Sequence, residues 1–430
     1  MADLSYVRTE MLQPKEPPAT ERGVLKWARE NLFSTWTNSI LTIVSIYLIY
    51  YVLASIGPWL VHGIWRADSL SQCREIRDAL GYHEAACFAV IVDRWHQLIF
   101  GFYPQDIYWR PVLSFVLLFV ALAPILFDRV PRKMFWFSAL YPFLMVYLVW
   151  GGSVWAPISA LAGFAVGYLV YRFVSPMNAL AGLILAFLAP VIWWLYLASP
   201  IADVLHSIIP IELRPVQSKE IGGFLVSVII GVSGIALSLP LGIVLALGRQ
   251  SDMIIVKSIC VAFIEFIRGV PLITLLFTAS LLLNYFLPKG TNFDIIVRVI
   301  IMVTLFSAAY MAETIRGGLA ALPKGQYEAA DSLGLNYWQA QQLIIMPQAL
   351  KISIPSIVGI FIGLFKDTTL VLFIGIPDML GFTNLIRATT AWNGIYWELF
   401  IFIGVVFWIC CFSMSQYSQY LERKLQTDRH

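Results

Sequence analysis

The sequence predicts an all-α, polytopic membrane protein with about ten transmembrane helices. Of its 430 residues, 59% are hydrophobic and only 13% are charged, and the mean hydropathy is +0.76. A soluble domain carries about 25% charged residues. Several apolar runs reach the roughly 20 residues with which a helix crosses the hydrocarbon layer. A transmembrane β-barrel would show segments of about ten residues with alternating polarity, a pattern that this sequence lacks.

The apolar runs divide into two groups near residue 200. The upstream runs are rich in aromatic residues, whereas the downstream runs are richer in Gly, Val and Ile and contain ionisable residues. Charges in a membrane are costly and mark pathways or partner contacts. We therefore expect an N-terminal tail (1–37), a five-span extension (38–200) with a long loop (63–110), and a five-span functional core (219–425). The expected spans are 38–62, 111–127, 134–150, 156–172, 178–198, 221–247, 270–288, 293–315, 353–375 and 395–414.

The distribution of Lys and Arg predicts that both termini are cytoplasmic. Basic residues concentrate in the N-terminal tail and near 129–133, 249–257, 316–324 and 423–429. The alternate short loops, near 151–155, 286–292 and 376–394, are poor in them. This asymmetry follows the positive-inside rule, which loops as long as 63–110 obey only weakly. The 63–110 loop would then lie on the periplasmic side.

Cysteine is sparse, and two of the five cysteines fall in the 63–110 loop. On the oxidising side of the membrane, Cys73 and Cys87 could form a disulfide that closes a small loop. Two free thiols in a helical cap remain the alternative. Cys260, Cys410 and Cys411 fall in or beside apolar segments, where packing roles are expected.

A polar segment, 324–347, interrupts the apolar core. Its side chains would have no partners in lipid, so it cannot be a span. We expect a short helix that ends at Gly334, which can adopt positive φ. A second helix would start at Asn336, a good N-cap, and Pro347 would kink or restart the chain at the membrane. The expected exposed apolar side chains suit docking into a groove of another protein; they are Leu333, Leu335, Tyr337 and Trp338.

This segment resembles the EAA signature of ABC-importer permeases. Glu328-Ala329-Ala330 is followed at the signature spacing by Gly334, Ile344 and Pro347, and Met346 stands where the family has Leu. The resemblance implies a type I permease core, with 324–347 as a coupling loop whose coupling helix sits in a cleft of a cytoplasmic ATPase. It assigns ATPase coupling to Glu328, Ala329, Ala330, Gly334, Leu335 and Pro347.

Three other segments resemble signatures of the polar amino-acid (histidine/glutamine-type) permeases. These are Phe263–Leu272 (FIEFIRGVPL), Ser307–Gly325 (SAAYMAETIRGGLAALPKG) and Phe365–Leu370 (FKDTTL). The long N-terminal half is similar to that of the larger permeases of general L-amino-acid importers, where two unlike permeases pair. The resemblance implies an inner-membrane permease for polar or general L-amino acids. Its implied partners are a second permease, two copies of an ABC ATPase and a periplasmic binding protein.

The core contains two similar charged motifs, EFIRG (265–269) and ETIRG (313–317). Residues three apart share a helix face, so Glu265 could pair with Arg268, and Glu313 with Arg316. These groups are candidates for a path that accepts the ammonium and carboxylate of an amino acid. Alternatively, the arginines snorkel near the interface and neutralise their own glutamates. Gly269 and Pro271 are expected to break the helix beside Glu265.

A second polar group lies well inside the run 353–375. Lys366, Asp367, Thr368 and Thr369 would line either the substrate path or the interface between subunits. The threonine hydroxyls can also bond back to carbonyls of their own helix.

No catalytic set stands out in the sequence. A phosphate-binding loop of the G-x-x-x-x-G-K-[ST] type is absent, so ATP and Mg²⁺ are expected in the partner ATPase. The histidines lack metal-ligand spacing, and no metal, other cofactor or nucleic-acid partner is expected. An ion-coupled secondary transporter would leave the EAA signature unexplained. A membrane-embedded enzyme would need a nucleophile or metal cluster that the sequence does not offer.

Overall fold

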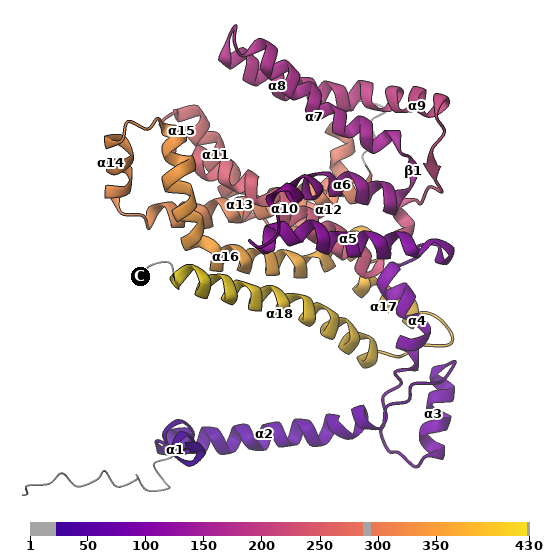
Figure 1. The fold of residues 1–430 in the computed structure, drawn as a ribbon. Coiled ribbons are helices and arrows are strands. Elements are labelled where there is room, and N and C mark those ends of the chain that lie inside the picture. The colour runs from indigo at the N-terminus through magenta and orange to yellow at the C-terminus, as the bar shows by residue number, and fades with distance from the viewer. Residues whose placement is uncertain (1–22, 287–293, 428–430) are drawn as a thin grey trace, which may run out of the picture. The chain divides into compact units, whose positions relative to one another are not determined.

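The computed structural model describes residues 23–286 and 294–427, and these form helices almost throughout (Figure 1). The described strands are one antiparallel pair of two-residue segments, β1 (Gly152–Ser153) and β2 (Glu212–Leu213). Most of the expected 286–292 loop, and much of the tail 1–37, lie outside the described residues.

The described residues form two compact units, one that ends at Ala89 and one that begins at Val90. In the first unit, Thr35 caps the first long helix by accepting a hydrogen bond from the Asn38 backbone N–H at 3.2 Å. The predicted division near residue 200 stays a prediction. The helices that begin before that residue are α1 (Gly23–Asn31), α2 (Trp36–Val61), α3 (Leu70–Ala79), α4 (Ala89–Phe100), α5 (Trp109–Leu126), α6 (Phe135–Trp150), α7 (Trp155–Val174), α8 (Ala179–Ile192) and α9 (Ala198–Ile208).

The second half of the chain continues with nine further helices. A π turn (Gln341–Ile345) precedes α16, and a 3₁₀ segment (Thr368–Ile374) follows it. The helices are α10 (Gly223–Gln250), α11 (Ile254–Gly269), α12 (Leu272–Phe286), α13 (Ile295–Ala320), α14 (Lys324–Ser332), α15 (Tyr337–Ala340), α16 (Met346–Asp367), α17 (Met379–Arg387) and α18 (Trp397–Thr427).

The predicted transmembrane architecture is confirmed. In the described ranges, nine helical stretches are long and apolar enough to cross a membrane, and a bent pair raises the number to ten. That pair is α11 and α12, whose axes differ by 102°. The bend falls at the break expected from Gly269 and Pro271, so the predicted span 270–288 is one arm of a bent element.

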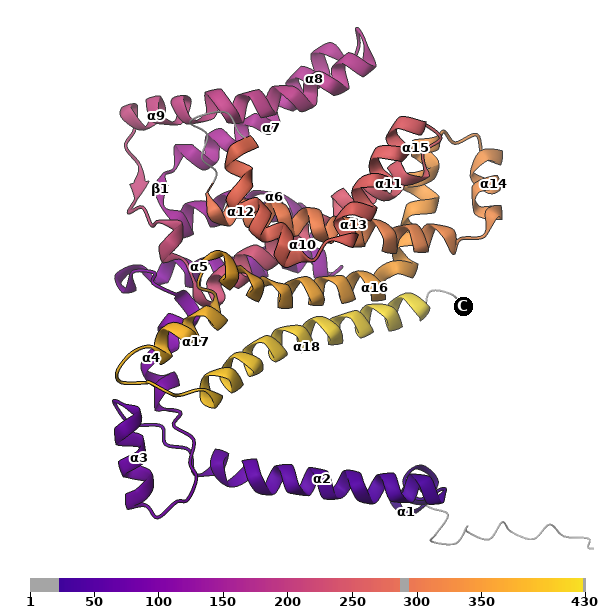
Figure 2. The same ribbon diagram turned by 180° about the vertical axis from the view of Figure 1, so that it is seen from behind.

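Small residues bring the central helices α10, α13 and α16 into close contact (Figure 2). A Cβ added to Gly242 of α10 would lie 2.6 Å from Met311 Cβ on α13. A Cβ added to Gly318 of α13 would lie 2.1 Å from Ser353 Oγ on α16. Membrane helices associate through such close backbone approach, because lipid offers no hydrophobic driving force between them.

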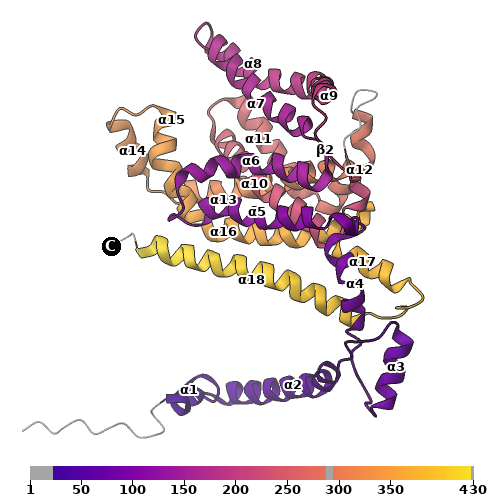
Figure 3. The same cartoon turned by 45° about the vertical axis from the view of Figure 1, so that its right-hand side comes forward.

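The helices α5 and α6 pack beside this centre, and α7 to α9 follow beyond α6 (Figure 3). Tyr141 of α6 donates a hydrogen bond to the Ser114 carbonyl of α5 at 2.9 Å, and both helices contact Val228 and Val232 of α10. In the π turn after α8, the Trp194 indole donates to the Ala160 carbonyl of α7 at 2.8 Å.

One end of the second unit is a junction of three connections. Tyr103 donates to the Val149 carbonyl at 2.8 Å, and burial raises the pKa of this phenol. Arg110 donates to the Arg214 carbonyl at 2.7 Å. The connection before α10 joins the segment before α17, where Gly223 N donates to the Pro377 carbonyl at 2.9 Å.

At the other end of the unit, the segment after α5 contacts the last turns of α18. Tyr417 donates to the Leu126 carbonyl at 2.6 Å. Lys424 pairs with Asp128, and this lysine holds the pKa of the Asp128 carboxyl below its usual range. The loops therefore alternate between two ends, as expected for successive membrane crossings.

Candidate functional site

The polar segment 324–347 projects at one end of the bundle as a helix, a turn and a second helix (Figure 1). The helix α14 ends in a hydrogen-bonded C-terminal cap. Gly334 N donates to the Asp331 carbonyl at 2.9 Å, and Leu335 N donates to the Ala330 carbonyl at 3.2 Å. Gly334 has φ +68°, as this type of cap requires. The sequence therefore folds here as the glycine predicts.

The second helix begins with a capping box. Asn336 Oδ1 accepts from Gln339 N at 3.0 Å, and the Gln339 side chain accepts from Asn336 N at 3.1 Å. The expected kink at Pro347 is a π turn (Gln341–Ile345) directly before α16, and helix continues on both sides of it. Proline has no N–H to donate to the preceding turn, so the local hydrogen-bond pattern shifts.

The outer surface of this segment mixes apolar and acidic side chains. Leu333, Tyr337 and Trp338 are exposed by 72%, 54% and 62%, whereas Leu335 is half-buried. Glu328 and Ala329 are exposed, and Ala330 is fully buried. Exposed aromatic and leucine side chains on a polar body fit the groove-docking role expected of the segment.

The inner surface of the segment is fixed to the membrane helices. Ile345 and Ala349 are fully buried in one cluster with Leu319 and Ile315 of α13, and Tyr327 packs against it. The Gln348 amide of α16 donates to Gln326 Oε1 of α14 at 2.8 Å. A force on the exposed surface would thus reach α13 and α16 through packed side chains.

Five charged side chains meet where α10, α11 and α13 converge, and Glu313 lies at their centre. Its Oε1 accepts from Arg316 at 2.6 Å, as the three-residue spacing predicts. Its Oε2 lies 3.4 Å from Arg249 and 3.8 Å from Arg268. The expected pairing of Glu265 with Arg268 is wrong, because Glu265 pairs with Arg249 at 2.8 Å. We call these five residues the Glu313 cluster.

Sequence reasoning missed two members of this environment. The sequence indicates only that Arg249 belongs to the basic stretch 249–257, whereas in the structure this arginine bridges both glutamates. Tyr310 lies under Arg268, with its ring centroid 5.5 Å from the guanidinium carbon. Tyr310 stands three residues before Glu313, so helical spacing could have placed it on the same face.

The second polar candidate group, Lys366–Thr369, lies at a different level along the helix bundle from the Glu313 cluster. Thr368 is fully buried, and its Cγ2 lies 3.6 Å from a Cβ position on Gly231, near the start of α10. Arg249 is 18 residues further along α10, which corresponds to about 27 Å of helix. The structure therefore does not bring Lys366–Thr369 together with the Glu313 cluster.

The side chains of this second group bond locally. Thr368 and Thr369 donate to the carbonyls of Phe365 and Lys366, at 2.8 and 2.9 Å. Lys366 is exposed and Asp367 is half-buried. The hydroxyls thus follow the local alternative that the sequence left open.

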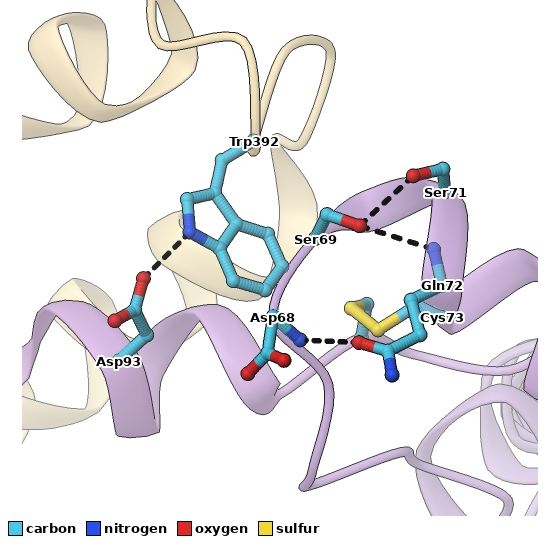
Figure 4. Close-up of a disulfide and its surroundings, with 8 residues drawn as sticks. Asp68, Ser69, Ser71, Gln72, Cys73, Asp93 and Trp392 are labelled. Atoms are coloured by element: carbon cyan, nitrogen blue, oxygen red, sulfur yellow. Dashed lines mark hydrogen bonds between the residues drawn. A yellow bond between two sulfur atoms is a disulfide. The ribbon is translucent and has the colours of Figure 1, made fainter.

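Cys73 and Cys87 are bonded as a disulfide in the first unit (Figure 4). Both cysteines are 3% exposed, and their bond closes a loop with a sequence separation of 14. The remaining cysteines, Cys260, Cys410 and Cys411, are free and half-buried.

Among the described residues, no group of three or more His, Cys, Asp or Glu is arranged to hold a metal ion.

The fold and site define a multi-pass membrane protein with a packed helical core and a polar helix–turn–helix segment at one end. The profile of the family described as "Binding-protein-dependent transport system inner membrane component" matches residues 238–427. The chain is 57% identical over 436 residues to the "Glutamate/glutamine/aspartate/asparagine transport system permease protein BztC" of Rhodobacter capsulatus, with 100% of each chain covered. It is 37% identical to the "Inner membrane amino-acid ABC transporter permease protein YhdY" of Escherichia coli, with 97% of each covered.

The chain therefore belongs to the amino-acid ABC-transporter permeases, which are multi-pass inner-membrane proteins. It is also similar to a solved structure described as "Crystal structure of an amino acid ABC transporter with histidines". That similarity has 29% identity and a TM-score of 0.41, and it covers 46% of this chain and 90% of the other.

Proposed function

We propose that residues 326–347 couple ATP hydrolysis in a partner subunit to amino-acid import. The observation that carries this proposal is the two-sided construction of the segment. Its outer surface exposes Leu333, Tyr337 and Trp338, and its inner surface is packed against α13 and α16. A docked ATPase would move the segment as a rigid body and shift these helices with it.

The complete importer would contain four further proteins. Two copies of a cytoplasmic ABC ATPase would hold ATP and Mg²⁺, and one would receive the exposed side chains of this coupling loop. A second, unlike permease would complete the pathway, and a periplasmic binding protein would deliver the substrate. The coupling loop and both termini would then be cytoplasmic, and the Pro377–Thr389 region would face the periplasm.

The transported class would be polar L-amino acids, including those with a carboxylate or amide side chain. The relative from R. capsulatus is named for glutamate, glutamine, aspartate and asparagine. The Glu313 cluster contains three guanidinium and two carboxylate groups, which can accept both charges of a zwitterion. It would line the inner part of the path, and Lys366–Thr369 would lie nearer the other end or at the interface between permeases.

The experiment is uptake of radiolabelled glutamate and glutamine by proteoliposomes that contain the assembled importer. Glu328→Ala and Gly334→Ala should lower both ATPase retention during purification and ATP-dependent uptake. The matched controls Asp331→Ala and Gly325→Ala change the same helix and should leave both near wild type. Unchanged retention and uptake in the Glu328 and Gly334 variants would contradict the coupling role. Uptake that survives ATP depletion but stops with an uncoupler would instead show an ion-coupled transporter.

A further inference from the structure

Helix α4 contacts the segment 376–396, which connects α16 to α18. The Trp392 indole N–H donates to Asp93 Oδ2 on α4 at 2.8 Å (Figure 4). Trp392 is fully buried, so this hydrogen bond fixes the turn after α17 from the side of α4. Beyond α4, the Phe102 ring meets the edge of Phe382 on α17, with centroids 4.9 Å apart. Phe382 is only 1% exposed.

Three glycines allow the backbones to meet beneath these side chains. Gly101 pairs with Ile221 in an antiparallel bridge, and Gly223 pairs with Asp378 in a parallel one. A Cβ added to Gly101 would lie 2.6 Å from the Gly222 backbone. A Cβ added to Gly222 would lie 2.6 Å from the Pro377 carbonyl oxygen. The chain after α4 is therefore built into the junction that holds the start of α17.

The two sides of this contact come from different parts of the chain. Residues 93–103 precede the region 238–427 that the family profile matches, whereas residues 376–396 lie inside it. The contact is also at the end of the bundle opposite the coupling loop, because α13 and α16 each run from one end to the other. The N-terminal extension thus reaches the core where the proposed function places substrate delivery.

We propose that Asp93, Phe102 and Trp392 are positioning residues that hold segment 376–396 in the resting arrangement of the importer. Alternating access requires loops at this end to exchange between two arrangements. A contact made in one arrangement favours that arrangement by its own free energy. Docking of the binding protein would release the segment, so hydrolysis without binding protein stays low while the contact holds. This inference rests on the proposed function.

The chain offers matched variants for the test. Trp392→Phe removes the donor, and Asp93→Leu removes the acceptor. Asp93→Asn keeps an acceptor oxygen but removes its charge, so it should weaken the hydrogen bond without breaking it. Arg94→Gln removes the ion pair between Arg94 Nε and Asp93 Oδ2, which are 2.8 Å apart, and leaves the Trp392 bond in place. Phe102→Leu loosens the ring contact without touching the hydrogen bond.

The measurement is ATP hydrolysis by the purified importer in proteoliposomes, with and without its binding protein. Trp392→Phe and Asp93→Leu should raise the rate without binding protein about tenfold, as expected for loss of a hydrogen bond to a charged group. The double variant should show no further increase, because both changes remove one interaction. Phe102→Leu should raise the rate as well, and Asp93→Asn should give a rate between those of wild type and Asp93→Leu. Arg94→Gln should keep the wild-type rate.

We call Trp392→Phe, Asp93→Leu and Phe102→Leu the contact-breaking variants. If these variants assemble into the importer but keep the wild-type rate without binding protein, the inference is overturned. It is also overturned if all three fail to assemble while Asp93→Asn assembles normally, because the contact would then serve folding alone. A wild-type importer that the binding protein does not stimulate would contradict the proposed function itself. The two failures are therefore distinguishable.

Discussion

The Arg249 guanidinium lies 2.8 Å from the Glu265 carboxylate, and this ion pair joins the last turn of α10 to α11. The same guanidinium lies 3.4 Å from Glu313 on α13. Because α13 leads within four residues to α14, the cluster connects the bent pair α11–α12 to the proposed coupling loop. Charge pairing thus joins α10, α11 and α13, and the packed core joins these helices to α16.

Replacing Glu313 should destabilise the protein more than replacing Glu265. Glu313→Gln leaves three arginines without their shared carboxylate, at a cost of roughly 1–3 kcal/mol. Glu265→Gln removes a half-exposed partner of one arginine and should cost less than about 1 kcal/mol. Thermal unfolding of the two variants in detergent checks the order. Equal apparent melting temperatures would show that Glu313 is not the centre of the cluster.

Two adjacent glycines on α13 should respond differently to alanine. Gly318→Ala places a methyl group against Ser353 and the Ala349 carbonyl and should cost about 1–3 kcal/mol. Gly317→Ala meets nothing within 4 Å and should be neutral or slightly stabilising, because alanine favours helix. Thermal unfolding measures both. A neutral Gly318→Ala variant would contradict the close contact of α13 and α16.

Asp378 should make stability fall as the pH rises from about 4 to about 6. Burial raises the pKa of its carboxyl to about 6, although Gly381 N donates to Oδ1 at 2.8 Å. The folded state then holds a proton that the unfolded state has released, so the free energy of unfolding decreases across this window. Two pH units correspond to roughly 3 kcal/mol.

The variant Asp378→Asn isolates this effect. Asparagine can still cap α17 but does not titrate, so the decrease between about pH 4 and pH 6 should shrink. Melting temperatures across that range, for wild type and variant, provide the comparison. Parallel profiles would show that Asp378 titrates at its ordinary pKa.

The disulfide should protect two of the five cysteines. Alkylation of the denatured, unreduced protein should modify Cys260, Cys410 and Cys411 alone. Mass spectrometry of the intact protein counts the modified cysteines. Cys73→Ala should destabilise the first unit by about 3 kcal/mol, as expected for a closed loop of some 15 residues. Five alkylated cysteines in protein purified from membranes under non-reducing conditions would contradict the bond.

Local patterns in the sequence predicted much of the fold. Gly334 determines the turn of the proposed coupling loop through its backbone conformation, and Asn336 determines the helix cap through its side chain. Both features depend on neighbouring residues alone, so the local sequence was enough to predict them. The break at Gly269 and Pro271 was predictable for the same reason. The transmembrane helices followed from the length of the apolar runs.

The partner of each charge was not predictable, because it depends on which helices meet. Helical spacing made Arg268 the neighbour of Glu265, but packing of α10 on α11 placed Arg249 closer. The contact between Asp93 and Trp392 joins residues 299 positions apart, and nothing in the local sequence signals it. Long-range pairing of this kind requires the tertiary structure.

The coupling role is tested most directly by cross-linking from the exposed outer surface of the coupling loop. A photoreactive amino acid at Leu333, which is 72% exposed, should capture the ATPase subunit in membranes that carry the whole importer. The same group at Ala330, which is fully buried, should not. An ATPase cross-link at position 333 alone is the predicted result. A fully active importer that yields no ATPase cross-link at position 333 would contradict the account.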